Sequence, residues 1–364
     1  MANATAGNLR RSETVFAWIM GAPAFAGLLV FLILPFVMAI GLSFTNQRLL
    51  SPNPTETVGL RNYDRLLSVS LLSLDPLTDE ATGEFLRDDD GQLQYPRSRN
   101  ITRDSENYPQ YDGYREWFAF ELGSTRHVVL AKDPVFLRSL LNNFTFALVV
   151  VPLQSGLALA LAMLINQKIP GVNIFRTIYF SPVVTSMVVI SIVWTFLYDR
   201  QVGLVNQFLT TISGGVIEPI NWLGSASTAL IAIIIMSVWQ GVGFQMVIFL
   251  AGLQGIPDVL YEAAQIDGAN RWQRFWSVTI PQLRNTIIFV AISTTILAFR
   301  LFTQVDVMTR GGPQNSTSTV VFHAVQRGFR ESDIGYASSI SVVFFMIVLV
   351  IALLQRRVLS QSEE

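Results

Sequence analysis

The chain has 364 residues, of which 51% are hydrophobic and only 14% are charged, with a net charge of −1 and a mean hydropathy of +0.44. Because soluble domains carry roughly a quarter charged residues, this composition excludes a disordered chain, a basic nucleic-acid-binding surface and an ordinary cytosolic enzyme. Cysteine is absent and the only histidines are His127 and His323, which excludes a thiol nucleophile, a thiolate metal site and a His-rich metal centre.

Charged residues are missing from six stretches of the chain, of which the fifth is interrupted by Arg300. A membrane-spanning helix needs about 20 apolar residues at a rise of about 1.5 Å each, and each stretch supplies them except the fifth, which does so only with Arg300 inside the span. The pattern therefore predicts an all-α membrane protein with six transmembrane helices, placed at 16–44, 138–165, 177–198, 228–253, 286–308 and 335–354. The first apolar core is far longer than the about 7–15 residues of a signal peptide, so we expect a retained helix.

The short loops differ in their content of Lys and Arg, which sets the orientation of a membrane protein. With the N-terminus inside, nine basic residues lie in cytoplasmic segments and four lie in the two short outer loops. We therefore expect both termini in the cytoplasm. Residues 1–45 would hold the N-terminus and the first span, residues 138–356 the membrane core with spans two to six, and residues 357–364 a cytoplasmic tail.

Residues 46–137, between the first and second spans, have a different composition. They hold 25 of the 51 charged residues, ten basic and fifteen acidic, and we expect a polar extracytoplasmic insertion here. Thr82–Tyr95 predicts a β-hairpin with Asp90-Gly91 at its turn. The acidic run Asp88–Asp90 lacks the carboxylate spacing of a calcium loop, so we interpret it as a solvated turn.

The loop 256–285, between the fourth and fifth spans, predicts two short helices joined by a turn. Pro257-Asp258 is a helix start, with the acidic residue near the positive end of the helix dipole. Gly268 permits a turn with positive φ, and Pro281 precedes re-entry into the membrane. An ordinary amphipathic loop at the membrane interface is the alternative, because Trp272, Phe275 and Trp276 favour that depth.

The spacing inside this loop resembles the Glu-Ala-Ala signature of the permeases of binding-protein-dependent ABC transporters. That signature is Glu-Ala-Ala, three residues, Gly, nine residues and Ile-x-Leu-Pro. Here it is matched by Glu262-Ala263-Ala264, Gly268 and Val278-Thr279-Ile280-Pro281, with Val and Ile as apolar replacements. A pattern of several residues at the expected place in the topology is a specific signal.

Further segments resemble carbohydrate permeases. They are Gly59–Leu67, Asp133–Asn143, Met308–Pro313 with Ser316–Thr319, and Gly335-Tyr336-Ala337. The resemblance covers roughly residues 14–67 and 133–357 and is to the large permease subunit of maltose-like sugar importers. It implies the type I ABC importer permease fold, and it leaves residues 68–132 without an assigned role.

The resemblance implies a heteromeric, ATP-driven importer in the bacterial inner (plasma) membrane. Its substrate would be a sugar, either an oligosaccharide or a glucoside. The implied partners are a second permease, two ATP-binding subunits and an extracytoplasmic solute-binding protein. The only lysines, Lys132 and Lys168, do not follow glycine, so this chain has no phosphate-binding P-loop. ATP and Mg²⁺ would be bound by the partner subunits, and this chain would be no enzyme and hold no cofactor. The implied coupling contacts are Glu262, Ala263, Ala264, Gly268 and Pro281.

A sugar site near mid-membrane needs planar polar groups and aromatic rings, and polar residues inside spans are functional candidates. In maltose-like relatives the spans on both sides of the coupling loop supply the sugar contacts. We expect the substrate to bind to one helical face of the fourth span and to one helical face of the fifth span. The face of the fifth span includes Arg300, Thr303 and Gln304. The candidates are Ser237, Gln240, Gly241, Phe244, Phe299, Arg300, Thr303 and Gln304.

Structural explanations exist for several of these residues. Ser237 and Gly241 suit close helix packing equally well. An alternative to solute contact is that Arg300 forms a structural ion pair, with Asp306 or with the partner permease. We expect His323 at the surface. Two other functions stay open. One is a permease of the same family for glycerol phosphate or another small anionic solute, which Arg300 would suit. The other is an ion-coupled secondary transporter, although the two halves of the chain show no internal repeat, which such transporters commonly have.

Overall fold

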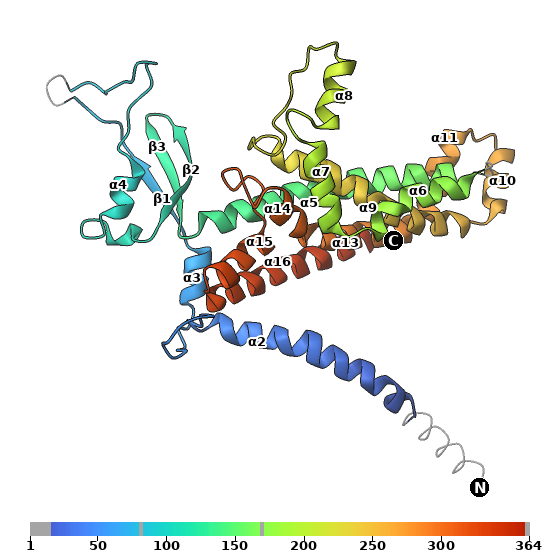
Figure 1. The fold of residues 1–364 in the computed structure, drawn as a ribbon, viewed down its shortest axis with the longest axis horizontal. Coiled ribbons are helices and arrows are strands. Elements are labelled where there is room, and N and C mark those ends of the chain that lie inside the picture. The colour runs from blue at the N-terminus through green and yellow to red at the C-terminus, as the bar shows by residue number, and fades with distance from the viewer. Residues whose placement is uncertain (1–15, 80–82, 168–170, 361–364) are drawn as a thin grey trace, which may run out of the picture. The chain divides into compact units, whose positions relative to one another are not determined.

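The computed structural model describes residues 16–79, 83–167 and 171–360, which are mainly helical (Figure 1). The chain divides into two compact units. One comprises Met1–Leu66 and Gln326–Val343, and the other comprises Leu67–Val325 and Phe344–Glu364. Five of the described helices are long and apolar enough to cross a membrane, and a bent helix pair supplies a sixth crossing if it counts as one span.

The first unit contains the N-terminal helix, Phe16–Ser43. A π-helical turn, η1 (Leu29–Ile33), precedes its last part, α2 (Leu34–Ser43). None of its most apolar stretch is buried inside the protein, as expected of a helix that crosses a membrane at the edge of the chain. The span predicted at 16–44 is confirmed.

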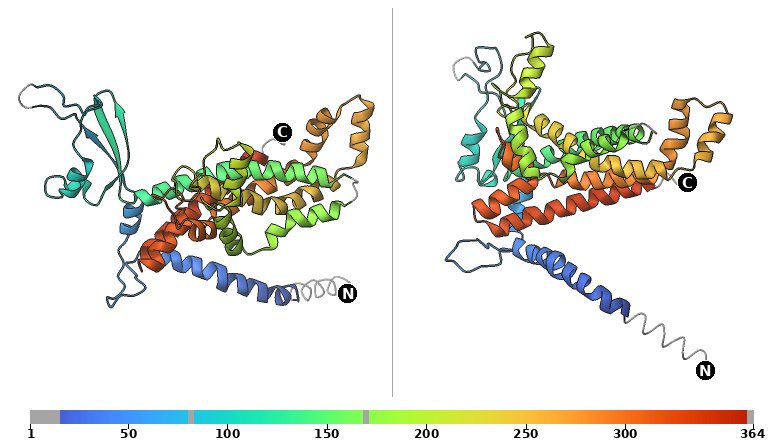
Figure 2. Two further views of the ribbon diagram at one scale, coloured as in Figure 1. Left: turned by 45° about the horizontal axis from the view of Figure 1, so that its top comes forward. Right: turned by 45° about the vertical axis from the view of Figure 1, so that its right-hand side comes forward.

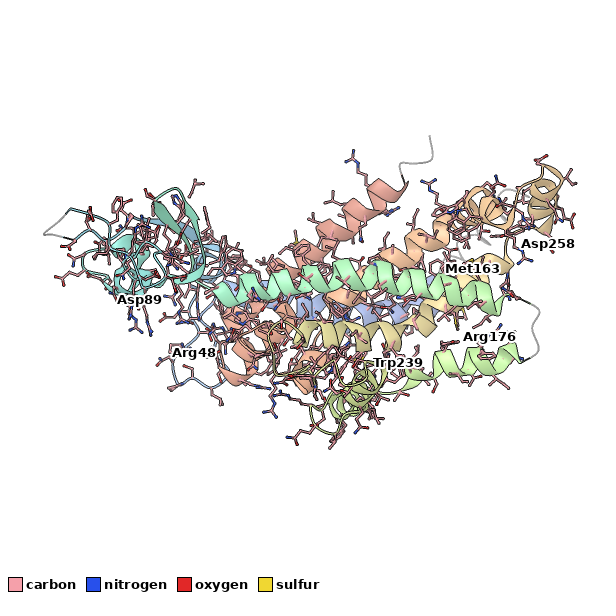
Figure 3. All side chains as sticks on the ribbon, turned by 90° about the horizontal axis from the view of Figure 1, so that it is seen from above. Arg48, Asp89, Met163, Arg176, Trp239 and Asp258 are labelled. Carbon is pink, nitrogen blue, oxygen red and sulfur yellow. The ribbon has the colours of Figure 1, made fainter. Side chains whose placement is uncertain are left out.

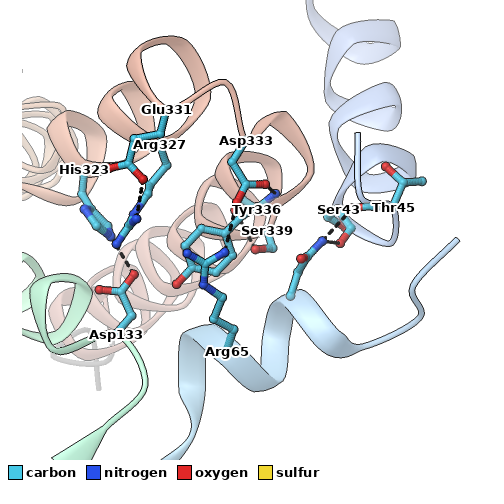
Figure 4. A network of polar contacts seen from close by, with 11 residues as sticks. Ser43, Thr45, Arg65, Asp133, His323, Arg327, Glu331, Asp333, Tyr336 and Ser339 are labelled. Atoms are coloured by element: carbon cyan, nitrogen blue, oxygen red, sulfur yellow. Dashed lines mark hydrogen bonds and ion pairs between the residues drawn. The ribbon is translucent and has the colours of Figure 1, made fainter. Parts of the chain in front are cut away.

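The first unit also holds α3 (Arg61–Leu67, with its last residue in the second unit), η4 (Gln326–Arg330) and the beginning of α16 (Ile334–Ser360). Polar contacts join these elements (Figure 4). Asn62 donates to the carbonyl of Ser43 at the end of α2 (2.8 Å). Arg65 pairs with Asp333 (3.0 Å), and its guanidinium lies 4.0 Å from the ring centre of Tyr336. The end of the first helix is thereby held to the start of the last.

The second unit begins with a three-stranded antiparallel sheet of β1 (Val69–Leu74), β2 (Arg115–Leu122) and β3 (Thr125–Ala131) in the order β1-β3-β2. The short helices α4 (Ser98–Arg103) and η2 (Pro109–Tyr111) precede β2. Leu72, Leu74, Val128 and Leu130 form a small buried core, against which tyrosines pack. Val69 lies opposite Ala131, so the chain enters and leaves the sheet at the same end.

The sheet corrects part of the sequence interpretation. In the predicted hairpin, Thr82 lies outside the described residues, and the rest forms an isolated bridge between Arg87 and Leu93 instead of regular strands. Its turn lies where predicted, with Gly91 at φ 79°. The regular hairpin is β2–β3, which turns at Gly123-Ser124. The sheet is confined to the insertion, and the membrane part is helical as predicted.

The membrane part of the second unit is built around α5 (Pro134–Ile165), α9 (Ala229–Gln254) and α13 (Arg284–Phe299), which run side by side (Figure 2). Ala158 and Ala162 of α5 are fully buried and allow α9 to approach closely, where Met246 and Phe249 fill the contact. Leu283, just before α13, completes this core. The spans predicted at 138–165, 228–253, 286–308 and 335–354 match helices within a few residues.

The third predicted span, 177–198, is wrong as a single straight helix. The structure has α6 (Val172–Val184) and α7 (Met187–Leu197), whose axes differ by 101° at a break of two residues, Thr185-Ser186. Pro182 lies one turn before the break, and β-branched or hydroxyl side chains follow it. The charge pattern showed only that the segment is apolar and carried no signal for the bend.

The remaining helices lie in the connections of the second unit. They are α8 (Leu204–Ile212), α10 (Asp258–Ile266), α11 (Arg271–Arg274), η3 (Phe275–Thr279), α12 (Ile280–Gln282), α14 (Thr303–Met308) and α15 (Val320–Val325). In Figure 3, Asp89 of the insertion lies at one end of α5, and Met163 and Asp258 lie toward the other end.

Candidate functional site

A cavity of about 400 Å³ lies among α5, the α6–α7 break, α9, and the segment from α13 to α14. It brings together seven of the eight residues proposed from the sequence: Ser237, Gln240, Gly241, Phe244, Arg300, Thr303 and Gln304. The eighth, Phe299, does not line it. Its ring is buried edge-on against Phe144 (5.3 Å between ring centres) and near Phe344 (6.0 Å), which makes Phe299 a packing residue.

Two buried oxygen atoms in the cavity wall have no hydrogen-bond partner within the described part of the chain. They are Ser237 Oγ and Gln245 Oε1, in residues that are only 7% and 2% exposed. The amide nitrogen of Gln245 donates to Thr294 on α13 (2.7 Å), which fixes the orientation of the side chain. A buried polar group without a partner costs about 1–3 kcal/mol, so these two oxygens are unsatisfied in this arrangement of the helices.

Gln154 of α5 is a cavity residue that the sequence reasoning missed. A Cβ atom on Gly241 would lie 2.0 Å from Gln154 Nε2, so a larger residue at position 241 would displace this amide from its place. Gly241 therefore serves close approach, which was the packing alternative considered for it. The available signal was the single glutamine inside the apolar span 138–165.

The fifth span is broken where the cavity lies. α13 ends at Phe299 and α14 begins at Thr303, so Arg300, Leu301 and Phe302 interrupt the helix. The single helical face expected for Arg300, Thr303 and Gln304 is wrong, and it is the break that brings these residues to the cavity. Across the described residues Arg300 has no ion-pair partner, so the alternative pairing with Asp306 does not form.

The break exposes backbone groups that lipid cannot satisfy, and α5 and the segment before α15 supply partners for them. Asn143, which is fully buried, donates to the Phe299 carbonyl (3.3 Å) and accepts from the Val320 N–H (2.9 Å). Thr319 donates to the Leu301 carbonyl (2.7 Å). Residues 316–319, expected in an outer loop, are thus buried hydrogen-bonding groups that hold the discontinuity in place.

A buried hydrogen bond between Asp133 and His323 lies at the beginning of α5 (Figure 4). Asp133 Oδ1 accepts the N–H of Phe136 (3.0 Å) and caps the helix, while Oδ2 lies 2.8 Å from His323 Nε2. The side chains of Asp133 and His323 are only 2% and 6% exposed. The expectation that His323 lies at the surface is wrong, because α15 folds back against α5.

The loop 256–285 forms the predicted helix–turn–helix. The chain leaves α10 through Gly268 at φ 79°. The N–H of Ala269 bonds the carbonyl of Ala264 (2.9 Å) and the N–H of Gly268 bonds that of Gln265 (3.1 Å), the two bonds of a Schellman turn. A capping box of Asn270 and Gln273 then starts α11. The second predicted helix runs through α11 into η3 without a break in helical backbone angles and widens to a π-helical turn from Phe275.

Two side-chain hydrogen bonds tie the arms of this segment together, one between Tyr261 Oη and Thr279 Oγ1 (3.0 Å) and one from Arg274 to Gln265 Oε1 (3.4 Å). Around the turn the surface is apolar, with Ile266 86% and Trp272 67% exposed. Glu262, Ala263, Gly268 and Pro281 are exposed, and Ala264 is half-buried. An exposed apolar patch beside a fixed turn is typical of a protein-binding surface.

The fold and the site define a multi-pass membrane protein with a cavity between broken helices, lined by apolar side chains and several amide and hydroxyl groups, and with an exposed helical segment in the loop after α9. Comparison with known proteins gives the class. The family of binding-protein-dependent transport system inner membrane components matches residues 128–361. The chain belongs to this family of ABC transporter permeases, which is a family of transport proteins, and the ion-coupled alternative is thereby excluded.

Relatives and a solved structure agree with this membership. The chain is 40% identical to the lactose transport system permease protein LacF of Rhizobium radiobacter, over 64% of this chain and 79% of that protein. It is 36% identical to the trehalose/maltose transport system permease protein MalF of Thermococcus litoralis, over 56% of this chain and 68% of that protein. A chain of a bacterial ABC transporter that imports the acidic polysaccharide alginate has the same fold, with a TM-score of 0.67 at 17% identity over 99% of this chain and 100% of that chain.

Asn143 offers a test of how the break is held. Asn143→Ala should lower the unfolding temperature in detergent, because the Phe299 carbonyl and the Val320 N–H each lose a buried partner, at a combined cost of about 2 kcal/mol or more. Asn173→Ala, on an exposed position of α6, is the matched control and should leave the unfolding temperature unchanged. Equal unfolding temperatures for the two variants would contradict the role given to Asn143.

Proposed function

We propose that this chain forms half of the translocation pathway for a sugar, an oligosaccharide or a glucoside, in an ATP-driven importer. The observation that carries the proposal is the cavity with its amide and hydroxyl groups, among them Gln154, Gln240, Gln304 and Ser237, with Phe244 at its wall. Such planar polar groups beside an aromatic ring suit a polyhydroxylated solute. The relatives named for lactose and for trehalose/maltose transport support a sugar as substrate.

The proposed complex contains a second permease, two ATP-binding subunits and an extracytoplasmic solute-binding protein. ATP and Mg²⁺ would be bound by the ATP-binding subunits, and this chain would catalyse no reaction. The α10–α11 segment would contact one ATP-binding subunit through Glu262, Ala263, Ala264, Gly268 and Pro281. The exposed apolar surface beside Gly268 supports this role.

The proposed orientation places both termini and residues 256–285 in the cytoplasm and residues 46–137 outside. The distribution of basic residues in the short loops supports it. The structure is consistent with this arrangement, since the sheet adjoins the first residues of α5 while α10 follows the C-terminal end of α9. Ala162 and Ile165 near the end of α5 pack with Leu253 and Ile256 after the same end of α9.

A small anionic solute, such as glycerol phosphate, is a second candidate, and Arg300 favours it. A guanidinium inside a membrane span is costly unless it meets water, a partner or an anion. Arg300 lines the cavity without an ion-pair partner in the described ranges of the chain. A neutral sugar would use Arg300 as a hydrogen-bond donor, whereas an anion would require its charge.

The cavity can be tested by uptake measurements on the assembled complex. Gln240→Leu and Gln304→Leu remove hydrogen-bonding groups at similar size, and each should lower uptake of the transported sugar several-fold to about tenfold. Gln254→Leu, at the end of α9 and away from the cavity, is the control and should transport normally. Full uptake in both cavity variants would move the sugar site to the partner permease.

Arg300 separates the two candidate substrates. Arg300→Leu should reduce uptake of a neutral sugar partially, through the loss of hydrogen bonds of about 0.5–1.5 kcal/mol each, but should abolish uptake of an anion. Assembly with the partner subunits should persist, because Arg300 pairs with no described acidic residue. Uptake of radiolabelled lactose and of glycerol phosphate by the same variant distinguishes the candidates.

The turn at Gly268 tests coupling. Gly268→Val should lose copurification of the ATP-binding subunits, because a β-branched residue at positive φ costs about 1–2 kcal/mol and distorts the turn. Gly268→Asn should retain it, since asparagine tolerates this conformation and no atom lies within 4 Å of the added Cβ. Normal copurification with Gly268→Val would argue against this surface as the docking site.

The absence of native cysteine allows a direct test of orientation. A cysteine replacing Gln92 should react with an impermeant thiol reagent added outside intact spheroplasts. One replacing Asn270 should react only after the membrane is opened. The opposite pattern would invert the proposed topology and remove residues 256–285 from the cytoplasm.

A further inference from the structure

A second cavity, of about 690 Å³, lies in the insertion between α4 and the beginning of β2. Its wall carries Arg99 and Arg103 from α4 and Arg115 from β2, together with Thr102 and Tyr114. Neither the family match, which begins at residue 128, nor the relatives assign a role to this part of the chain. We call this feature the arginine cleft.

The arginine cleft concentrates positive charge, with three arginines and one acidic residue, Glu116, in its wall. Arg99 and Arg103 are four residues apart on one helix, a spacing at which like charges repel by a few tenths of a kcal/mol. Arg115 faces the same cavity from the first position of β2. Within the described part of the insertion none of the three arginines forms a salt bridge.

Two acidic groups close to the arginine cleft have other partners. Glu116 lies in its wall, but its carboxylate accepts a hydrogen bond from Ser98 and lies 3.9 Å from Arg126. Asp104 follows α4, and hydrogen bonds from the side chain and backbone of Asn107 hold its pKa below the usual range. Both carboxylates are therefore held by neighbours outside the trio of arginines.

The composition of the insertion does not explain this gathering of arginines. Residues 46–137 contain fifteen acidic and ten basic residues, so a random surface there would be negative on balance. Three unpaired guanidinium groups around one concave surface are the arrangement that binds carboxylates, because the planar fork of arginine donates two parallel hydrogen bonds to a carboxylate. The hydroxyl groups of Thr102 and Tyr114 add donors and acceptors suited to a sugar hydroxyl.

We propose that the arginine cleft is a binding site for a carboxylated saccharide, such as the uronate residues of an acidic oligosaccharide. The carboxylate would be bound by Arg99, Arg103 and Arg115, and the ring hydroxyls by Thr102 and Tyr114. The site is separate from the membrane cavity and shares no residue with it. It would hold an acidic sugar on the insertion whether or not the membrane cavity transports it.

The experiment uses the full chain in nanodiscs of phosphatidylcholine and isothermal titration calorimetry. Trigalacturonate should bind, and its fully methyl-esterified form, which has the same rings without the charges, should bind at least about tenfold more weakly. Binding of the acid should weaken as salt is raised, because the charges of the cleft are accessible to solvent.

Variants connect this binding to the cleft. Arg99→Gln combined with Arg103→Gln should weaken trigalacturonate binding about tenfold or more, and Arg115→Gln alone should weaken it measurably. Arg97→Gln removes the same charge two residues away, outside the cleft, and should bind like the unchanged protein. Unfolding temperatures show whether each variant is folded, and Arg115→Gln keeps the test valid if the double variant is not.

Three results would overturn the proposal. One is equal binding of the acid and its ester. Another is binding that survives the cleft variants but disappears in Arg300→Leu, which would place the ligand in the membrane cavity. The third is loss of binding in nanodiscs that contain phosphatidylglycerol, which would mean that lipid head groups occupy the cleft. Failure of sugar uptake in the Gln240→Leu or Gln304→Leu variants bears only on the proposed function.

Discussion

A helix that breaks at membrane depth leaves N–H and C=O groups that lipid cannot bond, so their partners must come from the protein. In this chain much of that requirement falls on one face of α5. Ser139 bonds Ser318, Asn142 donates to the carbonyls of Asn315 and Ser318, and Asn143 bridges the end of α13 to the start of α15. The cavity exists because this buried polar face allows the fifth span to open at Arg300 without leaving its backbone groups unsatisfied.

The same helices that line the cavity also carry the exposed turn. α9 contributes Ser237, Gln240 and Phe244 to the cavity and leads directly into α10, while α13 returns from η3 to the break at Arg300. The two helices are packed together near the turn through the buried core around Leu253 and Leu283. The turn and two walls of the cavity therefore belong to the same pair of packed helices.

Features that depend on the composition of a single segment could be predicted from the sequence. Features that depend on contacts between distant segments could not. The spans follow from missing charges, and the cavity residues of α9 from polar side chains on an apolar helix. The turn at Gly268 was predictable because only backbone geometry was involved. By contrast, the break after Phe299 and the burial of His323 against Asp133 depend on partners far away in the chain. The bend at Thr185-Ser186 leaves no mark in the charge pattern. The sheet was missed because its longest strands, β2 and β3, lie in a stretch whose aromatic residues fit an interfacial position equally well.

The pairing of Val69 with Ala131 has a consequence for how such a chain can change over time. The backbone N–H of Lys132 also bonds the carbonyl of Ser68 (3.2 Å), so the two points where the polypeptide crosses into the insertion adjoin each other. A segment whose ends meet can be lengthened, exchanged or deleted without moving the elements that flank it. Residues 69–131 can therefore be replaced as a unit in the course of evolution. The same position is suitable for inserting a reporter or an epitope by design.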